Sequence, residues 1–243
     1  MATKKTASAK NDFPRPYTTV DVLIFTVVAD ALKVLLVQRP SGSDEPSPGL
    51  WALPGGFVNV DLDADLQACA RRKLAEKTGV ASPYLEQLGS WGSATRDPRG
   101  WSATHAYFAL MPVDGVTLTR GANAADVAWF TVDDHLLAKK KLAFDHADIL
   151  RAGVERLRSK VEYTSLPAYL LPEPFTLPQL QRTYEVVLGR PVDKSGFRTR
   201  MIAGDFLAEA GTVESDSNRP PMGYRLKDRS GPVFFPRTFS PRG

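Results

Sequence analysis

The sequence predicts an α/β protein in which a mixed sheet sandwiched by helices is followed by a smaller C-terminal domain. Residues 20–28 and 32–38 are apolar and rich in β-branched side chains, and three residues separate them, so they predict a hairpin. Residues 64–78 have a helical composition, and Gly79 is placed to end that helix. Further strands are expected at 85–91, 102–110 and 127–130.

The strongest helical pattern lies at residues 146–161, where apolar side chains recur on roughly one face. Asp145 directly precedes this helix and is a natural N-cap, so we interpret Asp145 and His146 as helix-capping residues. Three prolines then interrupt any helical period between Tyr163 and Pro174. We therefore expect a disordered basic tail at 1–16, a first domain at 17–161, a linker or the edge between two domains at 162–174, and a second domain at 175–243.

The second domain begins with two helices in quick succession. Thr176 and Gln179 have the spacing of a capping box, and Gly189 is placed to end the first helix. A basic helix is expected at 194–203, followed by short strands at 207–213 and 224–227. Helix, turn, basic helix, strand, loop and strand is the order of a winged helix-turn-helix.

Composition limits the classes of protein that the chain can represent. Of its 243 residues 43% are hydrophobic and 24% charged, as in a soluble globular protein, and the single cysteine excludes an internal disulfide. No apolar run reaches the roughly 20 residues that cross a bilayer, so we expect a cytoplasmic protein without a membrane partner. The net charge of +4 is locally concentrated, since residues 176–200 hold five cationic and two acidic side chains. A polyanionic partner is therefore expected at the C-terminal domain.

Residues 51–57 (WALPGGF), the helix after them and Gly79 resemble the Nudix domain. The signature of that family is Gly, five residues, Glu, seven residues and then Arg-Glu-aliphatic-x-Glu-Glu-x-Gly. Its glutamates hold a divalent metal that polarises a nucleoside diphosphate for attack by water. Here Arg72 and Glu76 fall on the pattern, but Lys73 and Lys77 replace the two outer glutamates. The stretch from Gly56 to the arginine is also two residues too long, and Leu62 occupies the nominal position of the first glutamate.

These replacements predict a pocket that has lost hydrolysis. Mg²⁺ takes oxygen ligands, and a charged lysine has no lone pair to offer. A cation beside two other cations is disfavoured by several kcal/mol even at an effective dielectric constant of about 20. We therefore expect no catalytic residue and no metal ligand, and two lysines that either bind a diphosphate directly or form a solvated helix face. The alternative is a hydrolase of ADP-ribose-type nucleoside diphosphates with an accessory C-terminal domain, in which Asp61, Asp63 and Asp65 rebuild a metal site; we favour capping of the helix for these aspartates.

Five segments carry a closer resemblance, to the Nudix-related transcriptional regulators of the NrtR family. They are residues 86–88 (EQL), 96–102 (RDPRGWS), 142–146 (LAFDH), 173–178 (EPFTLP) and 197–200 (FRTR). The resemblance implies a homodimeric repressor of NAD-biosynthesis or salvage genes that binds double-stranded DNA at a palindromic operator. It also implies that ADP-ribose, or a related nucleotide, is the effector and that no cofactor is required.

Candidate binding residues follow from these patterns. The nucleotide is expected to contact Arg39, Arg72, Lys73, Glu76, Lys77, Arg96, Arg99 and Phe144. Simpler roles stay open, because Arg72 can serve to orient Glu76, Arg99 can pair with Asp97, and Phe144 can belong to the core. DNA is expected to contact Gln181, Arg182, Lys194, Ser195, Arg198, Thr199, Arg200 and Arg219. A third reading, a nucleotide-sensing adaptor whose last domain binds protein, predicts no salt-dependent affinity for a duplex.

Overall fold

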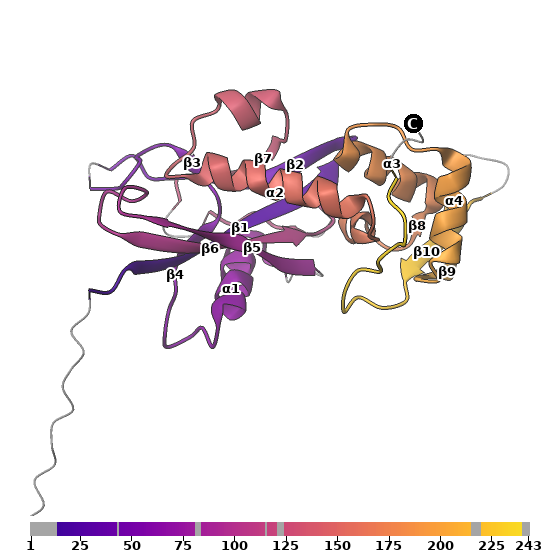
Figure 1. Ribbon diagram of the computed structural model, residues 1–243, viewed down its shortest axis with the longest axis horizontal. Helices are drawn as coiled ribbons and strands as arrows, with labels where there is room; N and C mark the ends of the chain where they lie inside the picture. Colours follow the sequence, from indigo (N-terminus) through magenta and orange to yellow (C-terminus); the bar gives the residue numbers. More distant parts are fainter. Residues whose placement is uncertain are drawn as a thin grey trace, which may run out of the picture.

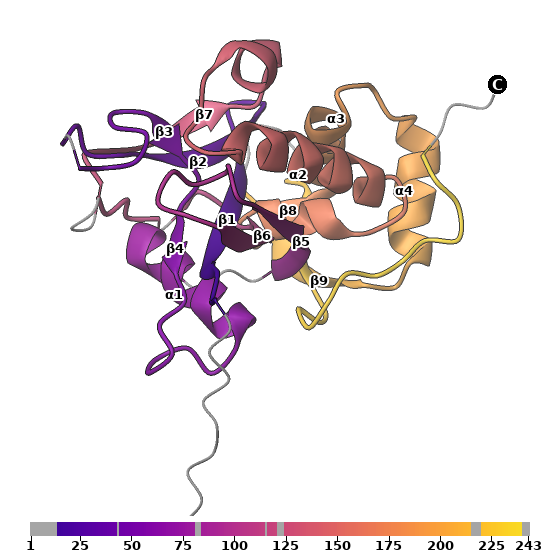
Figure 2. The same cartoon turned by 60° about the vertical axis from the view of Figure 1, so that its left-hand side comes forward.

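The computed structural model describes residues 14–42, 44–80, 84–114, 116–120, 124–214 and 220–239. Figure 1 shows a mixed sheet with helix α1 (Leu66–Thr78) against one face and helix α2 (His146–Val161) against the other. A smaller domain of helices and short strands packs at the far end of α2 (Figures 1 and 2). In the described ranges no helix combines the length and the apolar character that a membrane crossing requires.

The sheet is organised around strand β1 (Tyr17–Val28), which is buried on both faces. It pairs antiparallel with β2 (Ala31–Gln38) and parallel with β6 (Ser102–Leu110). Ala29 and Asp30 connect the first pair with φ of 49° and 57°, so the predicted hairpin closes through two left-handed residues. The sheet order is β3-β2-β1-β6-β5, with β4 also paired to β1 and β7 to β2.

The remaining strands are β3 (Trp51–Ala52), β4 (Gly55–Phe57), β5 (Tyr84–Ser93) and β7 (Asp126–Thr131). Strands β5, β6 and β7 lie where the sequence predicts them, whereas β3 and β4 were missed because they are too short to show alternation. A single π-helical turn, η1 (His135–Lys139), was missed as well.

Alternating side chains of β1 feed two hydrophobic clusters. Leu23 and Phe25 pack with α2, and Val22 and Ile24 pack on the face covered by α1. Helix α1 begins after Asp65, whose side chain accepts from the Ala68 N–H, and ends at Gly79 with φ 70°. The predicted start at Ala64 was therefore two residues early.

The proline-rich segment that we expected to be a linker is buried. Residues 166–170 form a 3-10 helix, η2 (Leu166–Leu170). All five side chains are buried, and four of them, all but Pro167, belong to the hydrophobic cluster that contains α2. The prolines do end the α-helical period, as expected. The apolar residues between them nevertheless fill the space between α2 and the C-terminal domain, so this segment is not a free linker.

The C-terminal domain has two helices and a three-stranded sheet. Helices α3 (Leu177–Leu188) and α4 (Lys194–Ala203) are joined by a short turn after Gly189, which has φ 70°. Strands β9 (Leu207–Thr212) and β10 (Met222–Leu226) pair antiparallel, and β10 also pairs with β8 (Phe175–Thr176), a strand that the sequence did not predict. The predicted capping box is present, because Thr176 accepts from the Gln179 N–H and Gln179 accepts from the Thr176 N–H.

We expect Thr176→Ala to destabilise the C-terminal domain by about 1 kcal/mol, because the buried N-terminus of α3 loses its cap. Urea denaturation monitored by circular dichroism measures the change. Thr199→Ala is the control, since Thr199 is exposed on α4. Equal stability of the two variants would contradict a role for the capping box.

Candidate functional site

A cavity of about 580 Å³ opens between β1, β4, α1 and the N-terminal end of α2. Its lining combines cations, carboxylates, glycines and two phenylalanines. The charged side chains are Asp21, Arg39, Glu45, Lys73, Glu76, Lys77, Arg96, Asp97 and Arg99. Five are cationic and four are acidic, so the wall carries an excess of one positive charge when His146 is neutral.

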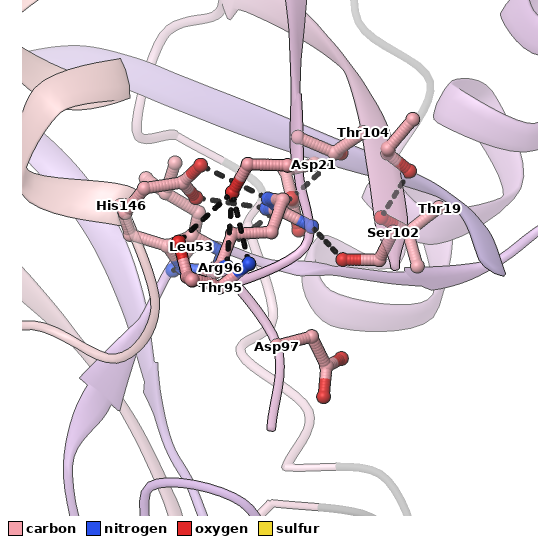
Figure 3. Close-up of polar contacts among 12 residues, drawn as sticks. Thr19, Asp21, Leu53, Thr95, Arg96, Asp97, Ser102, Thr104 and His146 are labelled. Carbon is pink, nitrogen blue, oxygen red and sulfur yellow. Dashed lines mark hydrogen bonds and ion pairs between the residues drawn. The ribbon is translucent and has the colours of Figure 1, made fainter. Parts of the chain in front are cut away.

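Asp21 stands at the centre of a buried polar cluster at the base of this cavity (Figure 3). Its Oδ2 accepts from the Thr104 hydroxyl at 2.7 Å and lies 3.4 Å from Nε2 of His146. The Leu53 N–H donates to Nδ1 of His146 at 2.9 Å, so a neutral ring carries its proton on Nε2, facing Asp21. Burial alone would raise the pKa of Asp21, but His146, Thr104 and Arg96 together hold the pKa below its ordinary value.

Arg96 joins this cluster to the start of α2. Its guanidinium makes two hydrogen bonds with Asp145, at 2.8 and 2.9 Å, and lies 3.7 Å from Asp21. Asp145 makes no side-chain capping bond to α2, so our interpretation of Asp145 and His146 as capping residues was wrong. A bidentate ion pair with a buried arginine is stronger than a capping hydrogen bond, and it engages both carboxylate oxygens of Asp145.

Two arginines of the cavity wall lie against aromatic rings. Arg39 is 5.0 Å from the ring centre of Phe144 and is held by Glu45 at 2.7 Å. Arg99 is 5.1 Å from the ring centre of Phe57. Asp97 holds that guanidinium at 2.7 Å, which confirms the ion pair considered from the sequence. Burial lowers the pKa of Arg39, so an anion entering the cavity would stabilise its charged form.

Helix α1 presents Lys73, Glu76 and Lys77 to the cavity. Lys77 donates to the Arg120 carbonyl at 2.6 Å, and burial lowers its pKa. Arg72 does not line this cavity. It binds Asp63 through two hydrogen bonds, at 2.6 and 2.7 Å, and Glu76 at 2.8 Å, which fits the simpler role of orienting Glu76, and its contact with the nucleotide stays a prediction.

These donors do not fit a divalent cation. Glu76 is engaged by Arg72 and lies 3.5 Å from Lys73, so its oxygens face cations. Asp63 is held by Arg72, and Asp65 caps α1. A metal ion here would need carboxylates that are free to turn toward one point, and these side chains are committed elsewhere.

The sequence reasoning missed part of this site. Asp21, Glu45 and Phe57 line the cavity and were not proposed as binding residues. An aspartate within an otherwise apolar strand was the available signal for Asp21, because a carboxylate at such a position must be paired. No local pattern indicated Glu45 or Phe57, because their positions in the cavity wall depend on the tertiary arrangement of the segments that carry them.

On the C-terminal domain, the exposed face of α4 carries the predicted DNA contacts. Lys194, Ser195, Arg198 and Thr199 are all exposed, whereas Phe197 and Met201 point into the core. This placement leaves the N-terminal half of the helix, which enters the major groove in helix-turn-helix proteins, open to a partner.

Three other predicted DNA contacts are placed differently. Gln181 donates to the Val192 carbonyl and so holds the turn between α3 and α4. Arg182 pairs with Asp30 at 3.0 Å, across to the β1–β2 turn. Arg200 is packed 3.8 Å from the ring centre of Phe239, so its guanidinium is held against the C-terminal segment, and its contact with DNA stays a prediction. Arg219, predicted in the wing, lies outside the described residues.

The fold and the cavity define a Nudix-type domain joined to a winged helix. Residues 17–153 match the NUDIX domain, and residues 167–226 match the NrtR DNA-binding winged helix domain. The chain is 44% identical over 228 residues to the ADPR responsive transcriptional repressor NtrR of Acinetobacter baylyi, which covers 94% of this chain and 89% of the relative. The chain therefore belongs to the NrtR family of Nudix-related transcriptional regulators.

Two solved structures from Shewanella oneidensis extend the comparison. NrtR complexed with a 27mer DNA is 42% identical with a TM-score of 0.81, covering 91% of this chain and 98% of that one. The NUDIX domain of the same protein complexed with ADP ribose is 43% identical with a TM-score of 0.55, covering 62% and 94% respectively. The larger match spans both domains, so their arrangement is similar as well.

The lowered pKa of Asp21 has a consequence for stability. Because the folded-state pKa lies below the unfolded value, ionised Asp21 contributes stability above about pH 4 that is lost as the pH falls through the folded pKa. Asp21→Asn should cost about 1–3 kcal/mol at pH 7, and the cost should shrink progressively as the pH falls below about 4. Thermal unfolding from pH 7 to pH 2 tests this. A stability difference that stays constant across the range would contradict the assigned ionisation.

Proposed function

We propose that this protein is a transcriptional repressor of NAD-biosynthesis or salvage genes, that ADP-ribose is its effector, and that it acts as a homodimer on a palindromic operator. The observation that carries the proposal is the presence in one chain of a cation-lined cavity and an exposed basic helix. The DNA and ADP-ribose complexes of a relative that is similar along nearly the whole chain support both halves.

The cavity has the chemistry to hold a nucleoside diphosphate by itself. Arg39, Arg99, Lys73 and Lys77 supply positive charge to the cavity wall, and Arg39 and Lys77 are partly desolvated. These side chains would give a bound diphosphate the positive counter-charge that a hydrolase supplies with its metal. Phe57 and Phe144 offer flat surfaces to the sugar or base.

Hydrolysis is the alternative that the sequence left open, and we infer that this protein does not rely on it. Lys73 and Lys77 stand where the family's metal-binding glutamates are expected, and Glu76 is neutralised by its neighbours. Asp63 and Asp65, the carboxylates proposed to rebuild the site, are held by Arg72 and by the start of α1. The repressor relative, matched over most of both chains, supports the same reading.

The effector hypothesis predicts that ADP-ribose releases the protein from DNA. A fluorescent duplex is first enriched from a random pool by the wild-type chain, and its affinity is then measured by anisotropy with and without ADP-ribose. We expect saturating ADP-ribose to weaken binding at least about fivefold. Unchanged anisotropy curves, with binding of ADP-ribose shown separately, would refute its role as effector.

Lys77→Met provides the matched test of the cavity, because it removes one cation at similar side-chain length. We expect it to raise the ADP-ribose concentration needed for release by about tenfold, the equivalent of one charged hydrogen bond of roughly 1.4 kcal/mol. Lys139→Met, an exposed lysine on η1, is the control and should change nothing.

DNA recognition through α4 predicts a specific salt effect. Arg198→Ala should weaken duplex binding and reduce the slope of log K against log salt by about one, because one phosphate or base contact is lost. Arg151→Ala, on the exposed side of α2, is the control. A wild-type affinity that does not depend on salt would favour the adaptor reading, in which this domain binds protein.

A further inference from the structure

The C-terminal segment Val233–Phe239, which we call the strap, lies outside the winged-helix match that ends at residue 226. It runs back from β10 toward α2 and α4 and is drawn in yellow in Figures 1 and 2. The strap adds no strand to the wing sheet, and it joins the hydrophobic core through Phe235, with Phe239 packed against that core.

One side of the strap is bonded to the backbone just after α2. The Ser165 N–H donates to the Val233 carbonyl at 3.0 Å, and the Phe235 N–H donates to the Tyr163 carbonyl at 2.7 Å. The Phe239 N–H donates to the Glu162 carbonyl at 3.1 Å. This ladder fixes the strap to the end of the helix that begins at the cavity.

The other side of the strap holds the recognition helix. The guanidinium of Arg200 lies 3.8 Å from the ring centre of Phe239 and donates to the Thr238 carbonyl at 2.8 Å. The ring of Phe239 also lies 6.0 Å from that of Phe197, on the buried face of α4. The strap therefore contacts α4 on the face opposite its exposed DNA-facing residues.

Two buried charged atoms at this junction are unsatisfied. Among the described residues, Oε2 of Glu162 and Nη1 of Arg200 are buried without a hydrogen-bond partner. Glu162 also lies close enough to raise the pKa of Arg200, although burial lowers that pKa more. Because these two atoms make no hydrogen bond, a shift of α2 relative to α4 would break no hydrogen bond at either of them.

We propose that the strap couples the cavity to the recognition helix, with Arg200 and Phe239 as positioning residues for DNA binding. Helix α2 has 16 residues and so spans about 24 Å, from the Arg96–Asp145 pair at the cavity to Glu162 at the strap. A nucleotide that displaces Arg96 also displaces Asp145 and the N-terminal end of α2. The C-terminal end of α2 then moves with the strap, and the strap changes the position of α4. This inference rests on the proposed effector function.

The test is the ratio of duplex affinities without and with saturating ADP-ribose, measured on the full chain with the selected duplex. Phe239→Ala should reduce the ratio from at least about fivefold to less than about twofold while leaving ADP-ribose affinity unchanged. Phe239→Leu, which keeps an apolar contact, should retain most of the response. Phe234→Ala is the control, because Phe234 lies in the same segment but is 62% exposed.

The ratio separates coupling from simple destabilisation, which weakens both affinities equally and leaves the ratio unchanged. Arg200→Lys is the second variant, and it tests the coupling role of the strap if Phe239→Ala does not fold. It keeps the charge but loses the stacked guanidinium, so its ratio should also fall. If both variants keep the wild-type ratio of duplex affinities, the coupling role of the strap is refuted, but the effector function is not. If the wild-type ratio is one, ADP-ribose does not change duplex affinity, and both the effector function and the coupling role of the strap are refuted.

Discussion

The buried ion cluster around Asp21 constrains the architecture of the sensing domain. A carboxylate in the central strand is unfavourable unless cations and donors meet it, and Arg96, His146 and Thr104 do so from three different elements. Their convergence fixes the start of α2 against β1 and brings the loop of Arg96 to the base of the cavity. Gly55 is part of the same constraint, because a Cβ there would lie 2.0 Å from Oδ1 of Asp21.

Above this base, helix α1 presents cations to the cavity at positions where the Nudix signature has glutamates. The helix presents Lys73 and Lys77 beside a Glu76 that is already paired, so attraction for phosphate comes from fixed side chains. Hydrolysis requires a metal to activate water, whereas binding requires counter-charge alone. On the proposed function, such a site would bind a nucleotide without consuming it, which suits a sensor attached to a DNA-binding domain.

Local patterns in the sequence predicted most elements of the fold. The hairpin, the span of α2 and the capping box at Thr176 each depend on neighbouring residues, and each was confirmed. The cluster around Asp21 could not be predicted, because its partners lie 75 to 125 residues further along the chain. For the same reason Arg200 was assigned to DNA, since nothing near it in the sequence indicates that Phe239 covers it.

The central claim is that this cavity binds a nucleoside diphosphate through its own cations. Isothermal titration of the full chain with ADP-ribose, in EDTA and again in Mg²⁺, tests it most directly. The account predicts the same dissociation constant within about twofold in both buffers and recovery of intact ADP-ribose afterwards. Binding that appears only with Mg²⁺, or conversion of the ligand to AMP and ribose 5-phosphate, would contradict it.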